Sequence, residues 1–403
     1  MSSQPPVTPL IYLDYAAATP LLPEAYEAMA PWLTTEYANP SAIHSGGVRA
    51  RAAIEAVRQQ IARVLAVRTT EVTFTSGGTE SNNLAIKGYL QSLHASGRAY
   101  TTMEVLTTAT EHPSVTETLA EVSTWGVRVV TVPVDGDGII PLAAFKDELT
   151  NQTVLCVLAY VNSEVGTIQP IRSIRRVLDE RYRGVTRPML LVDGAQAPLW
   201  LPCQLTTLGA DAVTFDVGKF CGPKGVGVLV ARSPMVIRPV IGGGGQEQGI
   251  RPGTENVAGI VGAGVAFEWA QTGYVERADI VRAVRDEGLV YCLGQLPDCV
   301  VNGAADERRV ANNLNISLPS VDTEYAVVVL DAHGIAASTK SACAGAGGGR
   351  SEVVFAMTGD YARSAATLRL TLGPDVTRDD LARTTEVLRR HCMQMAVLRQ
   401  DNY

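Results

Sequence analysis

Three short runs of the chain are apolar at almost every position, without the alternation expected of a strand that has one face in water. They cover residues 154–158, 189–193 and 227–230, and the second run ends in an aspartate. A strand that is apolar on both faces belongs to a sheet that is covered on both faces. This feature restricts the fold to a sheet enclosed between layers of helices.

Helix-like segments alternate with these strands over the first two thirds of the chain. Apolar residues recur every three or four positions over residues 50–67, which predicts an amphipathic helix. Residues 71–75 predict a strand, which a glycine pair separates from a helix over about 79–90. A further helix is expected over about 257–271. The order predicts an α/β fold whose large domain has a mostly parallel central sheet flanked by helices.

The pattern changes near residue 275, where we place a domain switch. Beyond it, residues 313–318 and 367–372 alternate polar and apolar side chains. Such alternation is typical of half-exposed antiparallel strands. The C-terminal part is therefore expected to form a second, smaller unit of mixed α and β structure.

Charge and hydropathy exclude some classes of partner. The 403 residues carry a formal net charge of −7 with no dominant basic patch, so we expect no nucleic-acid partner. No apolar run is long enough to span a bilayer, so we expect no membrane association. No charged leader precedes an apolar segment at the N-terminus, so we expect no signal peptide. The seven cysteines form no metal-binding spacing, which predicts no metal site and a reducing, cytoplasmic location.

One of these cysteines, Cys343, lies in an unusual segment. Small residues flank it, a glycine run follows it, and Lys340 and Arg350 lie nearby in sequence. Such a segment need not hold one conformation, and the cations favour the thiolate form of the thiol. The pattern is that of a nucleophile on a mobile tether. The alternative is a loop thiol without a role.

Three other features indicate a phosphate-bearing cofactor when they are taken together. The turn 75–83 sets paired glycines before a helix, where backbone N–H groups suit a phosphate, although many α/β turns carry paired glycines. Asp193 ends a buried strand and can hold a cationic ring nitrogen, or can simply cap a helix. Lys219 follows an apolar strand, and a partly desolvated lysine can form a Schiff base. Lys224 more simply shapes the turn or lies in solvent. The combination with Cys343 suggests pyridoxal phosphate and sulfur chemistry.

With these features in view, the chain resembles cysteine desulfurases of the NifS/IscS type, in the class V aminotransferase superfamily of fold-type I pyridoxal-phosphate enzymes. The resemblance runs nearly end to end. The matching segments, in order, are residues 12–20, 39–41 with His44 and Ser45, 75–88, 110–112, 161–166, Asp193 with Gln196, 251–254, and 341–343. The resemblance implies a large cofactor-binding domain over 22–274, and a small domain made of 1–21 and 275–403 that carries the Cys343 loop.

The resemblance also implies roles around the cofactor ring. Lys219 would hold the cofactor aldehyde covalently and later move the Cα proton of the substrate. Asp193 would pair with the pyridine nitrogen and keep the ring an electron sink. Gln196 would donate to the phenolic oxygen of the ring. His112 would stack on the ring and relay protons; without the resemblance, a lone histidine after a strand indicates a structural residue.

Further roles concern the phosphate, the substrate and the sulfur. Gly78 and Thr79 would hold the phosphate, and Thr254 would reach in from the second subunit of a homodimer. Asn162 and Arg369 would bind the substrate carboxylate, although an arginine in an alternating strand can also be merely exposed. The thiolate of Cys343 would take the sulfur of L-cysteine, which leaves L-alanine and a persulfide. An acceptor protein, either an iron–sulfur scaffold or a tRNA-thiolation enzyme, would then receive the sulfur.

The chain departs from the family pattern just before Lys219. The family usually has serine and histidine, which contact the phosphate, where this chain has Asp216 and Gly218. A carboxylate in the serine position would repel the phosphate dianion, so either Asp216 turns away or is protonated, or the phosphate site is rebuilt. We expect weaker cofactor affinity than is usual in the family. The glycines after Cys343 also differ from the usual loop, which leaves the acceptor open.

Three functions compete with a cysteine desulfurase. The same residues would serve a selenocysteine lyase, because sulfur and selenium require the same groups. A catalytically weak homologue that acts as a sulfur-transfer scaffold is supported by Asp216 and Gly218. It is opposed by the retention of Lys219, Asp193, His112 and Cys343. A plain aminotransferase has no use for Cys343.

Overall fold

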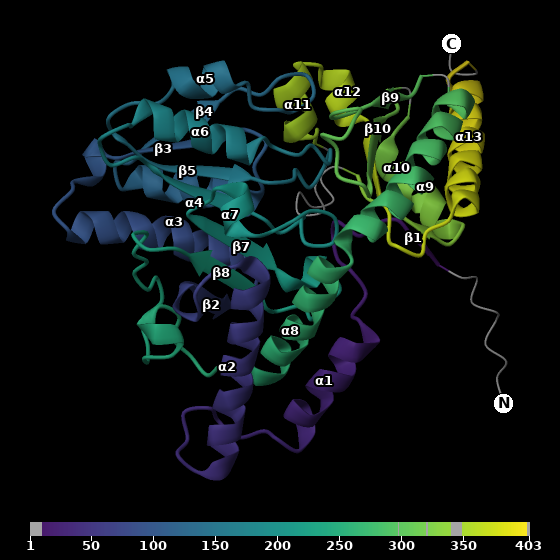
Figure 1. Ribbon diagram of the computed structural model, residues 1–403. Coiled ribbons are helices and arrows are strands. Elements are labelled where there is room, and N and C mark those ends of the chain that lie inside the picture. The colour runs from purple at the N-terminus through teal and green to yellow at the C-terminus, as the bar shows by residue number, and fades with distance from the viewer. Residues whose placement is uncertain (1–9, 297, 320, 340–348, 401–403) are drawn as a thin grey trace.

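The computed structural model describes residues 10–296, 298–319, 321–339 and 349–400, and the predicted nucleophile Cys343 lies outside them. A seven-stranded sheet forms the centre of the larger part of the molecule (Figure 1). Its strands, in spatial order, are β2 (Val72–Thr75), β8 (Gly227–Ala231), β7 (Ala212–Asp216), β6 (Met189–Asp193), β5 (Thr153–Ala159), β3 (Glu104–Thr108) and β4 (Arg128–Val132). The strands from β7 to β4 are parallel, and β8 is antiparallel to both of its neighbours, which confirms the mostly parallel sheet.

Side chains of the sheet alternate between two apolar layers. In β5, Leu155 and Val157 pack in one cluster with helices α3 and α4, whereas Cys156 and Leu158 pack in the other. The helices around the sheet are α2 (Ser45–Leu65), α3 (Gly78–Ala95), α4 (Pro113–Thr124), α5 (Leu142–Asp147), α6 (Ile171–Arg181) and α7 (Leu205–Leu208). The apolar runs of the sequence are thus explained by a sheet covered on both faces.

Local sequence signals set the ends of these helices. Helix α2 begins where the His44 side chain accepts a hydrogen bond from the Gly47 amide, and it ends at Ala66, which adopts the left-handed conformation. Its buried face includes Ile54, Ile61 and Leu65, as the periodicity predicts. Helix α8 (Val257–Thr272) packs against both α1 (Pro23–Thr34) and α2 at the lower end of the molecule in Figure 1.

The C-terminal part forms smaller sheets. Strands β9 (Val300–Val301), β10 (Asn313–Ser317) and β12 (Thr367–Thr371) are antiparallel, and β1 (Ile11–Tyr12) pairs in parallel with β11 (Ile335–Ala336). The remaining helices are α9 (Tyr274–Gln295), α10 (Thr323–Ala332), α11 (Glu352–Thr358), α12 (Tyr361–Ala365) and α13 (Arg378–Gln400). The N-terminal strand therefore lies with the C-terminal part. The domain boundaries 22–274 and 275–403 stay a prediction.

The expectation that β10 and β12 are half-exposed is wrong, because both strands are buried at every position. Their polar side chains are not in water, and several of them are hydrogen-bonded internally. The amides of Asn313 and Asn315 both donate to the Glu164 carbonyl, at 2.9 and 3.0 Å. An alternating pattern can therefore arise in a buried strand when one face carries hydrogen-bonded side chains.

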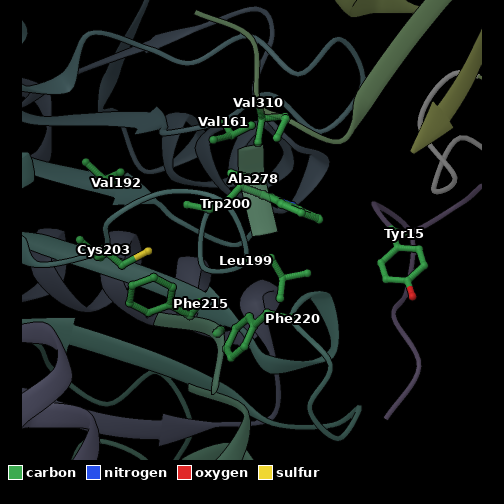
Figure 2. Packing of buried hydrophobic residues seen from close by; sticks show 14 of the residues in the cluster. Tyr15, Val161, Val192, Leu199, Trp200, Cys203, Phe215, Phe220, Ala278 and Val310 are labelled. Atoms are coloured by element: carbon green, nitrogen blue, oxygen red, sulfur yellow. The ribbon is translucent and has the colours of Figure 1, made fainter. Parts of the chain in front are cut away.

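An aromatic cluster supports the turn that carries Lys219. Phe215 and Phe220 flank this turn, and Figure 2 shows their side chains close together in the core. Both rings pack edge-on against Phe267 of α8, with centroid separations of 5.2 and 4.7 Å. Such packing fixes the backbone on both sides of the lysine. Among the helices that the structure describes, none has the length and apolar character needed to cross a bilayer.

Candidate active site

A pocket opens at the carboxyl ends of the parallel strands, which is where ligands bind in open α/β sheets. Its lining comes from the central sheet, from the N-terminal segment and from β12. The lining residues include the predicted Gly78, Thr79, His112, Asn162, Asp193, Gln196, Lys219 and Arg369, together with Ala16, Ala17, Asn82, Ser114, Ser163 and Asp216. Residues predicted from motifs far apart in the sequence thus meet in one place.

The carboxylate of Asp193 is held firmly at the end of β6. One oxygen accepts a hydrogen bond from the Ala195 amide at 3.0 Å, and the other accepts one from the Asn82 side-chain amide at 2.8 Å. Asn82 is itself fixed, because its carbonyl oxygen accepts from the Thr214 hydroxyl at 2.6 Å. The carboxylate therefore presents a fixed negative charge to the pocket.

His112 caps helix α4 and faces the same pocket. Its Nδ1 accepts from the Ser114 amide at 3.1 Å and lies 2.8 Å from the Ser114 hydroxyl, so a neutral ring carries its proton on Nε2. Burial lowers the pKa of the imidazole, although Asp193 opposes the shift. The ring is therefore neutral at pH 7, which suits contact with an aromatic cofactor.

Lys219 points toward the N-terminal segment. Its ammonium donates to the Ala16 carbonyl at 2.9 Å and also to the Ala17 carbonyl. Gln196 donates to the same Ala16 oxygen at 3.0 Å. Two backbone carbonyls hold the amine at the pocket wall, where it is half-buried.

Asp216 does not turn away from the glycine turn. Its two oxygens accept from the Gly78 amide at 3.1 Å and from the Gly218 amide at 3.0 Å. The carboxylate therefore lies at the beginning of helix α3, beside the predicted phosphate-binding residues Gly78 and Thr79. Of the arrangements expected from the sequence, a carboxylate directed away from this site is excluded. Lys224, expected to shape the turn or lie in solvent, is exposed and donates to the Thr19 carbonyl at 2.7 Å.

The two residues predicted to bind a carboxylate differ in what they already contact. The Asn162 carbonyl oxygen accepts from the amides of Glu164 and Val165, and its amide donates to the Thr110 carbonyl, so most of the side chain holds the local turn. Arg369 is 2% exposed, not the surface residue of the alternative interpretation.

Arg369 retains a capacity to bind an anion. Its guanidinium contacts Asp14 at 2.9 Å and the Ser163 carbonyl at 3.1 Å. Within the part of the chain that the structure describes, nothing accepts a hydrogen bond from its buried Nε. A buried guanidinium with an unsatisfied donor is suited to a carboxylate ligand.

Two predicted residues are not among those that line the pocket. Thr254 is exposed on the loop before α8, so this chain does not supply it to its own pocket. Cys343 is outside the described residues, but the segment that leads to it starts beside the site. Ser338 and Arg369 exchange backbone hydrogen bonds at 2.7 and 3.2 Å.

Sequence reasoning missed the residues that support the site. Asn82 and Ser114 received no role, although a buried asparagine in a helix is a signal, because such a residue needs partners. No sequence signal identifies the carbonyls of Ala16 and Ala17, because backbone groups carry no residue type. Together these groups determine where Asp193, His112 and Lys219 point.

The ring end of the pocket fits pyridoxal phosphate, since an anchored carboxylate, a neutral imidazole and an amine converge there. At the phosphate end, a carboxylate of the protein already lies on the Gly78 amide. No group of three or more metal-ligating side chains is placed to hold a metal ion within the described residues.

Comparisons with known proteins agree with this geometry. The family model for aminotransferase class-V matches residues 11–383. The chain is 37% identical to a cysteine desulfurase IscS of Dictyoglomus turgidum, with 94% of each chain covered. It is 36% identical to cysteine desulfurase IscS 1 of Archaeoglobus fulgidus, with 94% of this chain and 95% of that one covered. A solved NifS-like protein superposes with a TM-score of 0.87 at 30% identity, over 94% of this chain and 98% of that one. The chain belongs to the class-V aminotransferase family, in its group of NifS/IscS-type cysteine desulfurases.

Proposed function

We propose that this protein is a pyridoxal-phosphate-dependent cysteine desulfurase that converts L-cysteine to L-alanine and passes the sulfur to Cys343. One observation carries the proposal. The Lys219 amine, the anchored Asp193 carboxylate and the buried Arg369 guanidinium line a single pocket, and the segment that leads to Cys343 begins beside Arg369. A sulfurtransferase of this kind needs an amine, an electron sink and a nearby thiol.

Pyridoxal phosphate, when bound, supplies an aldehyde and a ring that withdraws electrons from the substrate Cα. Asp193 would keep the ring nitrogen protonated, because its carboxylate is held by Asn82 and the Ala195 amide. His112 would lie against the ring as a neutral imidazole. Gln196 has one amide hydrogen on Ala16 and a second that would reach the phenolic oxygen.

Lys219 has two tasks in this proposal. It would hold the cofactor between turnovers, and it would remove the Cα proton of the substrate once released. Both tasks require a neutral amine, so the ammonium must lose a proton and leave the carbonyls of Ala16 and Ala17. The substrate carboxylate would bind the guanidinium of Arg369, which lines the pocket, with Asn162 shaping that end of the pocket.

Sulfur transfer assigns the nucleophile to Cys343. Its thiolate would form a bond to the substrate sulfur while the bond between that sulfur and Cβ breaks, and the electron pair would pass to the carbon that becomes alanine. Cys343 is the fourth residue after Thr339, which is the last described residue before it. At the far end, the Ser351 hydroxyl bonds Glu164 at 2.6 Å, close to Asn162.

The remaining assignments stay proposals from the sequence. Gly78 and Thr79 would bind the phosphate, and an exposed Thr254 is available to the pocket of a second copy in a homodimer. Two further proposals also rest on the sequence: a cytoplasmic location, and delivery of the sulfur to an iron–sulfur scaffold or a tRNA-thiolation enzyme.

Alanine release from L-cysteine tests the proposal. Lys219→Ala should abolish both alanine formation and the visible absorbance of bound cofactor, whereas Lys224→Ala should retain both. Cys343→Ser should keep the absorbance but lose the protein-bound persulfide, which mass spectrometry detects. Cys299→Ser is the matched thiol control and should behave as wild type. Persulfide formation by Cys343→Ser, or alanine formation by Lys219→Ala, would refute the assignment.

A further inference from the structure

The carboxylate of Asp216 lies where an anion at the start of helix α3 would lie. It accepts hydrogen bonds from the amides of Gly78 and Gly218, and Gly78 is 138 positions away in sequence. A Cβ added to Gly77 or Gly78 would lie 3.4 or 3.2 Å from this side chain. Asp216 therefore sits directly against the glycine turn.

The contact supplies α3 with a cap that its own N-terminal residue lacks. Gly77 has no side chain with which to bond the first turn, so the carboxylate from β7 satisfies the Gly78 amide instead. An anion at a helix N-terminus is stabilised by free N–H groups and by the helix dipole. The groups that stabilise Asp216 are thus the groups that would bind a phosphate.

The cations near this turn have other partners. Lys224 packs near Gly218 but directs its ammonium to the Thr19 carbonyl at 2.7 Å. Arg251 is paired with Glu80 at 2.8 Å, and Glu80 also accepts from the Ser76 amide at 2.7 Å. A phosphate that binds at this turn must therefore compete with the Asp216 carboxylate for the Gly78 amide. Lys224 and Arg251 already have other partners.

We propose that Asp216 is a built-in occupant of the phosphate site and sets the specificity of this pocket for its cofactor. The inference rests on the proposed function. A phosphate must displace the carboxylate from the Gly78 amide, and two anions on one set of N–H groups repel each other. The phosphate group then adds little net affinity, so the pocket discriminates weakly between pyridoxal phosphate and pyridoxal.

The first test uses inorganic phosphate and the purified protein without cofactor. The melting temperature of the wild type should not respond to phosphate, whereas those of Asp216→Ser and Asp216→Asn should rise with its concentration. Asp322→Asn is the matched control, because Asp322 caps α10 through two backbone amides far from the pocket. Its response should equal that of the wild type.

The second test compares two ligands by absorbance titration. Asp216→Ser and Asp216→Asn should bind pyridoxal phosphate about tenfold more tightly or better than wild type, since removing one nearby charge has at least this effect. Their affinity for pyridoxal should stay within about twofold, because the ring end of the pocket is unchanged.

The outcomes separate this inference from the proposed function. The phosphate experiment contains no cofactor. If phosphate raises the melting temperature of the wild type as steeply as that of Asp216→Ser, the inference about Asp216 is overturned. Equal gains for both ligands, or a gain for neither, would overturn it as well. An absence of alanine formation would instead overturn the desulfurase proposal, and would leave the phosphate result intact.

Discussion

The side-chain amide of Asn82 donates to the carboxylate of Asp193 at 2.8 Å, across 111 positions of sequence. The same amide nitrogen donates to the Ser114 hydroxyl at 2.9 Å, and that hydroxyl lies 2.8 Å from Nδ1 of His112. One residue of α3 thus orients the acid that would face the ring nitrogen and the imidazole that would lie on the ring. Neither group can shift without disturbing the other.

Replacing Asn82 should therefore impair cofactor binding and turnover together. Asn82→Ala is expected to weaken pyridoxal-phosphate affinity and to lower kcat for alanine formation by about tenfold or more, as loss of an outer hydrogen-bond partner commonly does. Absorbance titration and a steady-state assay measure the two effects. Asn83→Ala is the matched control, since Asn83 bonds the Thr79 carbonyl of its own helix and does not line the pocket. Equal kinetics in Asn82→Ala and Asn83→Ala would contradict the role of Asn82 in orienting Asp193 and His112.

Arg369→Lys should raise KM for L-cysteine by about tenfold or more, because one ammonium cannot replace a fork that spans Asp14, Ser163 and the substrate. Cofactor affinity should change little. Arg363→Lys is the control, because Arg363 donates to Asn302 and Val301 and does not line the pocket. An unchanged KM in Arg369→Lys would remove Arg369 from substrate binding.

Glu111 should make stability depend on pH. Burial raises the pKa of this carboxyl to about 8, although it accepts hydrogen bonds from Thr108 and the Ala159 amide. A raised folded-state pKa gives stability that is complete below the unfolded pKa near 4.5 and is lost as pH rises through about 8.

Chemical denaturation at pH 5 and pH 8.5 tests this expectation. Relative to Glu111→Gln, the free energy of unfolding of the wild type should fall by roughly 4 kcal/mol between these pH values. Glu121→Gln removes the same charge at an exposed site and should run parallel to the wild type. Parallel curves for Glu111→Gln and wild type would show that Glu111 is ionised throughout.

Gly227→Ala should disturb the glycine turn from the neighbouring strand. A Cβ at Gly227 would lie 2.4 Å from the Gly77 backbone and 2.5 Å from the Thr75 hydroxyl. We expect a loss of about 1–3 kcal/mol in the free energy of unfolding, as for other overpacked sites, together with weaker cofactor binding. Gly136→Ala should be neutral, because a Cβ at that position would have no heavy atom within 4 Å. If Gly227→Ala has wild-type stability, the turn at Gly77 can shift to make room for the added methyl group.

The sequence predicted the elements that a strong physical pattern determines. The apolar runs identified β5, β6 and β8, and the rule that ligands bind at strand ends brought Asp193 and Lys219 together. The prediction that β10 is half-exposed was wrong. Its asparagines bond the carbonyl of Glu164, a residue distant in sequence that no local pattern identifies as their partner. The sequence also could not predict where the Asp216 side chain points, since this depends on the position of the Gly78 amide in the folded chain.

The ion pair between Asp14 and Arg369 joins positions 355 apart. During synthesis, every strand of the central sheet and Lys219 leave the ribosome well before β12 is made. A chain that ends before β12 contains Lys219 and every strand of the central sheet, yet it lacks the Arg369 guanidinium that lines the pocket. The pocket can therefore be completed only after nearly the whole chain has been synthesised.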